Sequence, residues 1–173
     1  MEEDFDEGLT QEAILKLFFE KGGNLDEINA AIDARLFRNR KRKITQFEGF
    51  IKTRIEVNPT VLNMAKMEID AAEATYLSQY PTLSQVEILD LRQNHIGDEG
   101  LMALCHSPVL TQLRELDLRN NDLTRNGAEG LLQAPNLKHL RKLDLRLNRL
   151  GSRWKDKLLS AENLPALEEV RVV

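Results

Sequence analysis

The sequence predicts an α/β fold. It is a short repeat solenoid, with a parallel sheet on the concave side and helices on the convex side, preceded by an all-helical N-terminal cap. Two observations support this prediction. Leucines and an asparagine return every 27 residues in the second half of the 173-residue chain, whereas the first half shows only helical spacing of apolar residues. We therefore expect a helical region over residues 1–58 and the solenoid over residues 59–173.

Composition excludes several classes of protein. With 42% apolar and 30% charged residues, the chain is typical of a globular protein that needs neither a metal nor a disulfide to hold its core. The single cysteine, Cys105, favours a reducing compartment, and the acidic N-terminus is unlike a signal peptide. A net charge of −4 argues against attraction of the whole surface to nucleic acid. We expect a cytoplasmic protein with no transmembrane segment, no cofactor and no metal.

Three helices are expected before residue 59. Thr10 can cap a helix through residue 20, which the pair Gly22-Gly23 ends, and a second helix follows over 24–36. The third helix begins near Thr45. There Thr45 and Glu48 have the spacing of a capping box.

Residues 59–80 admit two interpretations. Asn58 followed by Pro59 predicts the start of a long capping helix that runs to about residue 78. The alternative is a degenerate first repeat, because Leu62 lies one period before Leu89. We favour the helix, since Met67 stands where the clear repeats have an asparagine and cannot supply an amide.

Clear repeats begin at residue 81. The pattern LxxLxLxxNxL spans Leu113 to Leu123 and returns in the units before and after it. Alternating leucines predict a short strand, and the residues that follow have helical spacing, so each unit is a strand, a turn and a helix. One unit cannot bury its own apolar face, which is why neighbouring units must stack. The pattern resembles the leucine-rich repeat, and residues 97–104 and 127–132 resemble its helix-bearing, ribonuclease-inhibitor-like subclass.

An asparagine closes each strand of the repeat. It stands where the chain leaves the strand and turns inward, so that buried backbone groups need hydrogen-bond partners. An amide side chain offers both donors and an acceptor there. We therefore expect a structural ladder of Asn94, Asn121 and Asn148.

The residues between the buried leucines should form a charged concave face. Aspartates and arginines return in adjacent columns, so opposite charges lie two residues apart on each strand. One interpretation is a set of ion pairs that neutralise one another and keep the sheet soluble; the other is a surface that awaits a partner of complementary charge. The second interpretation predicts a noncatalytic module for protein–protein interaction. Its partner-binding residues would be Asp90, Arg92, Glu115, Asp117, Arg119, Lys142, Asp144, Arg146 and Arg171.

A basic run provides an alternative function. Six bases fall within nine positions at a predicted helix end, which is either a solvated junction or a patch for nucleic acid or an acidic membrane surface. In the second case the repeats would serve only as a scaffold. The run consists of Arg35, Arg38, Arg40, Lys41, Arg42 and Lys43.

No pattern indicates catalysis. No histidine has a partner at the spacing of a metal pair, and Cys105 has the phase of a buried core residue. We interpret Gly97, Gly100, Gly127 and Gly130 as turns into helices. Trp154, at the repeat position of two of these glycines, is expected to pack rather than to bind a ligand.

The last predicted strand, over residues 167–172, shows no following cap. A bare parallel strand can pair with a second chain, which predicts a possible homodimer. The alternatives are a chain that continues further, or coverage of this strand by the preceding helix.

Overall fold

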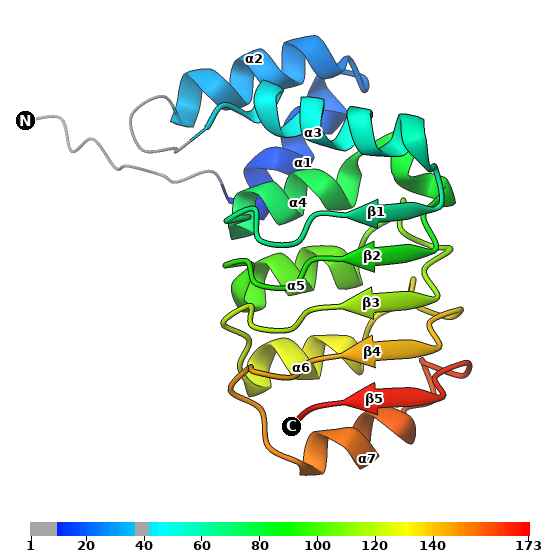
Figure 1. Ribbon diagram of the computed structural model, residues 1–173. Helices are drawn as coiled ribbons and strands as arrows, with labels where there is room; N and C mark the ends of the chain where they lie inside the picture. The colour runs from blue at the N-terminus through cyan, green and yellow to red at the C-terminus, as the bar shows by residue number, and fades with distance from the viewer. Residues whose placement is uncertain (1–9, 37–41) are drawn as a thin grey trace, which may run out of the picture.

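The computed structural model describes residues 10–36 and 42–173 and has the predicted α/β solenoid fold. Its five parallel strands follow one another in the sheet in the order of the sequence. Figure 1 shows the sheet on one side, helices α4 to α7 behind it, and helices α1 to α3 grouped at the end that carries β1. The strands are β1 (Val61–Asn63), β2 (Ile88–Asp90), β3 (Glu115–Asp117), β4 (Lys142–Asp144) and β5 (Glu169–Arg171).

The register of the sheet equals the period of the sequence. Leu62 pairs with Leu89, and Leu116 pairs with Leu143, so each strand is shifted by 27 residues from its neighbour. The central residue of every strand is buried, and the residues beside it on the strand lie on the concave face. Periodicity therefore fixes which side chains form a column across the sheet.

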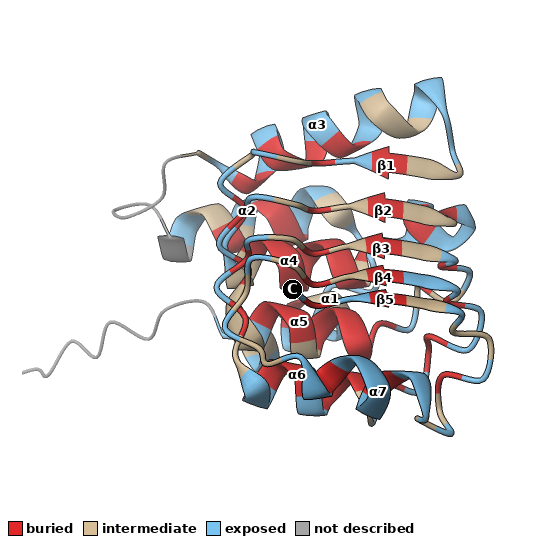
Figure 2. Ribbon diagram, turned by 60° about the horizontal axis from the view of Figure 1, so that its bottom comes forward, coloured by how far each residue is buried: buried red, intermediate tan, exposed pale blue. Residues whose placement is uncertain are grey.

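The helices cover the convex side and bury one face. Figure 2 shows buried residues on the sides of α4, α5 and α6 that face the sheet, where one continuous core joins the units. No helix in residues 10–36 and 42–173 combines the length and apolarity needed to cross a membrane. The helices are α1 (Gln11–Glu20), α2 (Leu25–Leu36), α3 (Ile44–Val57), α4 (Ala71–Gln79), α5 (Gly97–Cys105), α6 (Arg125–Leu131) and α7 (Arg153–Leu159), with a short 3₁₀ helix, η1 (Pro81–Gln85).

The prediction of one long helix over 59–78 is wrong. This stretch forms β1 and, after a turn, α4, so it is a degenerate first repeat. The amide of the next unit makes this possible. Asn94 Oδ1 accepts hydrogen bonds from the N–H groups of Met67 (2.9 Å) and Ile69 (3.1 Å). Because Asn94 supplies these bonds from outside, the first unit does not need an asparagine of its own at Met67.

The three N-terminal helices are where the sequence predicts them. Thr10 caps α1 by accepting a hydrogen bond from the N–H of Ala13 (3.2 Å), as predicted. Gly22 and Gly23 follow the end of this helix with φ of 56° and 80°. Glycine adopts this left-handed conformation without steric cost, which explains why the helix ends there.

The predicted capping box at the start of α3 is wrong. The helix begins at Ile44, whose N–H donates a hydrogen bond to Asp33 Oδ1 of α2 (2.8 Å). The N–H of Lys43 donates to Gln46 Oε1 (3.3 Å). A side chain of α2 therefore caps α3, and this frees Glu48 for a different role.

Glu48 is a buried carboxylate that joins the cap to the first repeat. It accepts hydrogen bonds from Tyr80 (2.9 Å), Tyr76 (3.3 Å) and Asn29, and its Oε1 lies 2.6 Å from Lys52 Nζ. Burial opposes ionisation of Glu48, but the bonds from Lys52, Tyr80 and Asn29 outweigh it and hold the pKa below 4.5. Burial and the nearby Glu48 raise the pKa of both tyrosines, which therefore stay protonated and donate.

Replacing this carboxylate tests the junction. We expect Glu48→Gln to lower the free energy of unfolding by about 1–3 kcal/mol at pH 7, because Lys52 loses its partner and the tyrosines lose a charged acceptor. Since the folded-state pKa of Glu48 is depressed, its contribution is present above about pH 4.5 and is lost as the pH falls through the folded value. Urea unfolding at pH 7 and pH 3.5 measures this. A difference between wild type and variant that does not shrink at pH 3.5 would contradict the assignment.

Three glycines permit close packing between neighbouring helices. A Cβ at Gly127 would overlap the carboxylate of Asp98, one at Gly130 would overlap Sδ of Met102, and one at Gly100 would lie 3.0 Å from Cβ of Ala74. The interpretation of these three as turn residues is wrong. Gly97 is the first residue of α5 and has a φ of 62°, a left-handed conformation that favours glycine.

Gly127→Ala should therefore destabilise the solenoid. The added methyl group displaces Asp98, which accepts hydrogen bonds from the N–H (2.8 Å) and Oγ1 (2.5 Å) of Thr124. We expect a loss of about 1–3 kcal/mol in urea unfolding. The matched control is Gly49→Ala in α3, where nothing lies within 4 Å of the added Cβ and a gain of about 0.5–1 kcal/mol is expected. Equal effects at the two positions would show that helix propensity, rather than close packing, governs Gly127.

Candidate functional site

The concave face of the sheet forms an open hollow of about 420 Å³. The lining side chains come from strands β2 to β5 and from Arg119 and Arg146, which follow β3 and β4. Nine of these side chains are charged: Asp90, Glu115, Asp117, Arg119, Lys142, Asp144, Arg146, Glu169 and Arg171. Eight of the nine residues predicted for partner binding are among them, and the ninth, Arg92, pairs with Asp90.

The aspartate column, which consists of Asp90, Asp117 and Asp144, has a structural role that the sequence analysis did not predict. In three units Oδ1 of the aspartate accepts a hydrogen bond of 3.1 Å from the N–H two residues later, at Arg92, Arg119 and Arg146. Asn63 does the same for the N–H of Ala65 in the first unit (3.1 Å). Each side chain thus closes a turn at the end of its strand. The first unit has Asn63 where the next three units have an aspartate, and both side chains offer an oxygen that can accept this hydrogen bond. This difference between units is the signal in the sequence that could have revealed the role.

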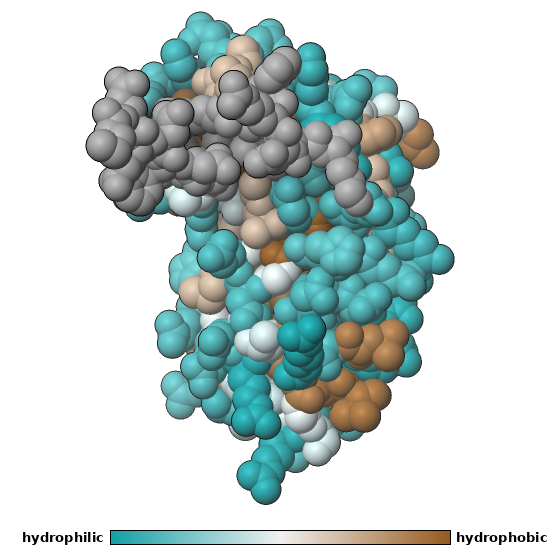
Figure 3. Space-filling view, turned by 90° about the vertical axis from the view of Figure 1, so that its left-hand side faces the viewer, coloured by the Kyte–Doolittle hydropathy of each residue, from teal (hydrophilic) through white to brown (hydrophobic). Residues whose placement is uncertain are grey.

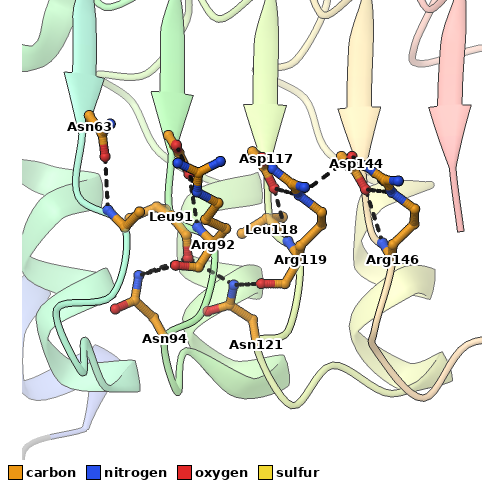
Figure 4. Close-up of polar contacts among 12 residues, drawn as sticks. Asn63, Leu91, Arg92, Asn94, Asp117, Leu118, Arg119, Asn121, Asp144 and Arg146 are labelled. Carbon is orange, nitrogen blue, oxygen red and sulfur yellow. Dashed lines mark hydrogen bonds and ion pairs between the residues drawn. The ribbon is translucent and has the colours of Figure 1, made fainter.

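The same aspartates hold the arginines in place, as Figure 4 shows. Arg119 Nη2 lies 2.6 Å from Asp117 Oδ2, and Nε lies 3.0 Å from Oδ1. Arg146 forms the same fork with Asp144, at 2.7 Å and 3.0 Å. Arg119 also reaches across to Asp144, with 3.6 Å between Nε and Oδ2. The guanidinium groups are therefore oriented before any partner arrives.

A second charged column lies at the start of the strands. Lys142 Nζ lies 2.9 Å from Glu115 Oε1 on the neighbouring strand, and Arg171 pairs with Glu169 at 2.6 Å. At the N-terminal end this column becomes apolar, because β2 contributes Ile88 there. This column thus changes from apolar to charged along the axis of the solenoid, whereas the neighbouring column is already charged at Asp90.

Opposite charges balance across the hollow. Burial by itself would raise the pKa of Asp144, but hydrogen bonds from the side chain and the backbone of Arg146 lower it below 3.8. The hydrogen bond to Asp117 likewise raises the pKa of Arg119. Both groups are therefore ionised at neutral pH. Each pair is partly exposed, so solvent screens it and its contribution to stability is small.

The asparagines satisfy the backbone of neighbouring turns. Asn94 Nδ2 donates to the carbonyls of Met64 (3.0 Å) and Leu91 (2.7 Å). Asn121 Nδ2 donates to Leu91 O (2.8 Å), as Figure 4 shows. Asn148 Nδ2 donates to Leu118 O (2.8 Å), and its Oδ1 accepts from the N–H of Asn121 (2.9 Å). These bonds link each unit to the one before it.

Much of the predicted basic run lies outside the described residues. This applies to Arg38, Arg40 and Lys41 and to the side chain of Arg35. Of the two described side chains, Lys43 is exposed just before α3, whereas Arg42 forms a fork with Glu73 of α4 at 2.8 Å and 2.8 Å. The guanidinium of Arg42 also lies over the rings of Phe47 (5.1 Å) and Phe50 (5.7 Å). Arg42 thus connects the cap to the first repeat.

The residues considered for other chemistry are packed or scattered. Cys105 is fully buried, which raises the pKa of its thiol to about 12 and leaves it unreactive at neutral pH. Trp154 is buried to 7% exposure, and Lys157 Nζ lies 4.3 Å from its ring centroid. Within the described part of the chain, no three His, Cys, Asp or Glu side chains are grouped so that they could hold a metal ion.

Comparison with known families identifies the repeats. The family model described as "Leucine Rich repeat" matches residues 84–105, 109–132 and 136–153, which are three successive units of the solenoid. Together with the 27-residue register and the parallel sheet, this match identifies residues 84–153 as leucine-rich repeats.

A solved structure shows the same fold. The chain titled "Leiomodin-1 Actin-Binding Site 2 (ABS2)" is similar with a TM-score of 0.51 at 14% sequence identity, over 73% of this chain and 79% of that one. At this level of identity the similarity concerns the fold alone. No curated protein matches the sequence significantly.

The aspartate column can be tested by two substitutions at one position. Asp117→Asn keeps an oxygen that accepts from the N–H of Arg119, as Asn63 does for Ala65, whereas Asp117→Ala removes it. We expect a loss of about 1–2 kcal/mol in urea unfolding for the alanine variant and less than half of this for the asparagine variant. Equal losses would mean that the charge of Asp117, and not its turn-closing oxygen, is what stabilises the strand end.

Proposed function

We propose that this protein is a noncatalytic protein-binding module that docks its partner on the concave face of the leucine-rich-repeat sheet. The contacting residues are eight of the nine charged residues that line the hollow, together with Arg92. They are Asp90, Arg92, Glu115, Asp117, Arg119, Lys142, Asp144, Arg146 and Arg171.

One observation carries this proposal: the arginine side chains are oriented and still partly open to solvent. Arg119 and Arg146 use Nε and Nη2 to hold an aspartate, and among the described residues no partner is bonded to their Nη1 atoms. Their side chains are 28% and 34% exposed. A fixed guanidinium loses little side-chain entropy on binding, so a carboxylate or carbonyl of a partner can accept from it at low cost.

The size of the face limits how strong this contact can be. Strands about 4.8 Å apart, each offering a few side chains, present on the order of 400 Å². A standard interface buries about 800 Å² per partner. The partner must therefore also touch the loops or the helical cap, and the charged columns contribute mainly specificity and fast, salt-sensitive association.

Reversal of one central charge tests the concave face. Arg119→Glu faces Asp117 and Asp144 and removes the oriented donor, whereas Lys155→Glu changes an exposed charge of α7 outside the hollow. All three proteins are used as baits in affinity capture from native lysate. We expect wild type and Lys155→Glu to retain the same partner proteins, and the amount of each partner retained by Arg119→Glu to be at least tenfold lower. Thermal unfolding of all three baits controls for folding.

Equal recovery of the same proteins by all three baits would refute the concave site. A loss on both variants would instead indicate a general effect of net charge, because the two substitutions change the charge by the same amount.

Actin is a purified partner that can be tested directly, because the similar solved structure is titled an actin-binding site. The similarity extends only to the fold, so binding to actin has to depend on the residues of this chain. Co-sedimentation with filamentous actin that is lost in Arg119→Glu but kept in Lys155→Glu would assign actin to the concave face. If the wild-type chain does not co-sediment, actin is not its partner, and the proposal that the concave face binds another protein is unaffected.

A further inference from the structure

An exposed leucine lies at the edge of the solenoid where β4 ends. Leu147 is 75% exposed and has φ of 60°. A leucine gains nothing from either condition: the left-handed region is sterically costly for a side chain with a Cβ, and an exposed apolar side chain is not stabilised by burial.

The equivalent positions of the other units show what the fold itself requires. Lys66, Gln93 and Asn120 precede Leu147 by whole periods, and all have positive φ. All three are polar and exposed. The backbone therefore imposes the conformation, and a polar residue such as asparagine, which tolerates it best, would serve the fold better than Leu147 does.

Three arginines without an ion-pair partner belong to the same two last units as this leucine. Arg125, Arg149 and Arg153 are exposed, and none forms an ion pair with a described residue. Two of them are the first residues of α6 and α7, where a positive charge opposes the helix dipole. Helix α5, by contrast, has Asp98 and Glu99 in its first turn.

Backbone contacts bring these residues to one edge. The N–H of Arg149 donates to Leu123 O (2.8 Å), so the loop after β4 lies against the loop that leads into Arg125. Figure 3 views this edge and shows hydrophobic surface among hydrophilic side chains over the last units.

The acidic side chains near this edge form no direct ion pair with Arg125, Arg149 or Arg153 among the described residues. Asp98 accepts bonds from Thr124, Asp122 lies 2.9 Å from His95, and Asp144 holds Arg146. Glu129 of α6 and Asp156 of α7 form no ion pair with a described residue either. The guanidinium groups of Arg125, Arg149 and Arg153 are thus left without a carboxylate partner among the described residues.

We propose that Arg125, Leu147, Arg149 and Arg153, named here the arginine edge, bind an acidic segment of a partner protein that carries an apolar side chain. The arginines pair with its carboxylates, and Leu147 packs against its apolar group. Nucleic acid offers phosphates but no aliphatic side chain, so it would leave Leu147 without a role. The proposal does not rest on the concave face, because none of its four residues lines the hollow.

The test uses a fluorescein-labelled peptide, Glu-Glu-Asp-Leu-Asp-Glu-Glu, and the same peptide with serine in place of leucine. We expect the full chain to bind the first peptide about tenfold more tightly than the second, as burial of a leucine predicts. Fluorescence anisotropy at several salt concentrations measures both. Equal affinity for the two peptides, or no binding of the first, would overturn the proposal.

The decisive variant is Leu147→Asn. It should raise the melting temperature by about 2 °C, because asparagine suits the left-handed backbone, and weaken binding of the first peptide about tenfold. If Leu147 had only a structural role, its replacement would not raise the melting temperature and weaken peptide binding at the same time. The control, Val57→Asn, changes another exposed apolar residue, at the end of α3, and should leave binding unchanged.

Competition experiments distinguish an acidic protein segment from the other ligands that could bind the arginine edge, namely nucleic acid and anionic membranes. Duplex DNA and vesicles with anionic headgroups are added to the bound peptide. If either one binds more tightly than the peptide and with equal affinity to wild type and Leu147→Asn, the edge is an anion site for that class and the proposal of an acidic protein segment fails. Weak competition that also depends on Leu147 supports the proposal.

Discussion

No unit of this solenoid is complete without the next one. Asn94 gives its amide to the turn of the first unit, and Asn148 does the same for the turn that contains Asn121. The leucines of neighbouring strands share one core in the same register. Because both hydrogen bonding and apolar burial cross the boundary between units, the array folds only as a stack. The curved sheet and its charged columns depend on this.

The first end of the stack is closed by helices α1 to α3, which have no repeat. Their apolar residues join the same core as the repeats, and polar side chains add contacts to the first unit. Glu48 gathers two tyrosines and a lysine, and Arg42 forms a fork with Glu73. Such contacts have directional requirements that leucine packing does not have, so they fix how the cap sits on the first strand.

The charged face shows how a structural role and a binding role can share the same residues. Asp117 closes a turn and also orients Arg119, which leaves part of the guanidinium open to solvent. The ion-pair interpretation and the binding interpretation of the columns are therefore compatible. At the arginine edge the balance differs, because Leu147 and its neighbouring arginines serve neither the turn nor the helix start.

Periodicity by itself determined the fold class, the register of the sheet and the positions of Asn94 and the charged columns. Every unit repeats the same environment, so a spacing of 27 residues translates directly into spatial neighbours. The tertiary structure alone decided the rest. Residues 59–80 become a repeat because a side chain from the next unit completes their turn, and Glu48 is buried because Asp33 of another helix caps α3. Contacts between segments that share no period leave no signal in local sequence.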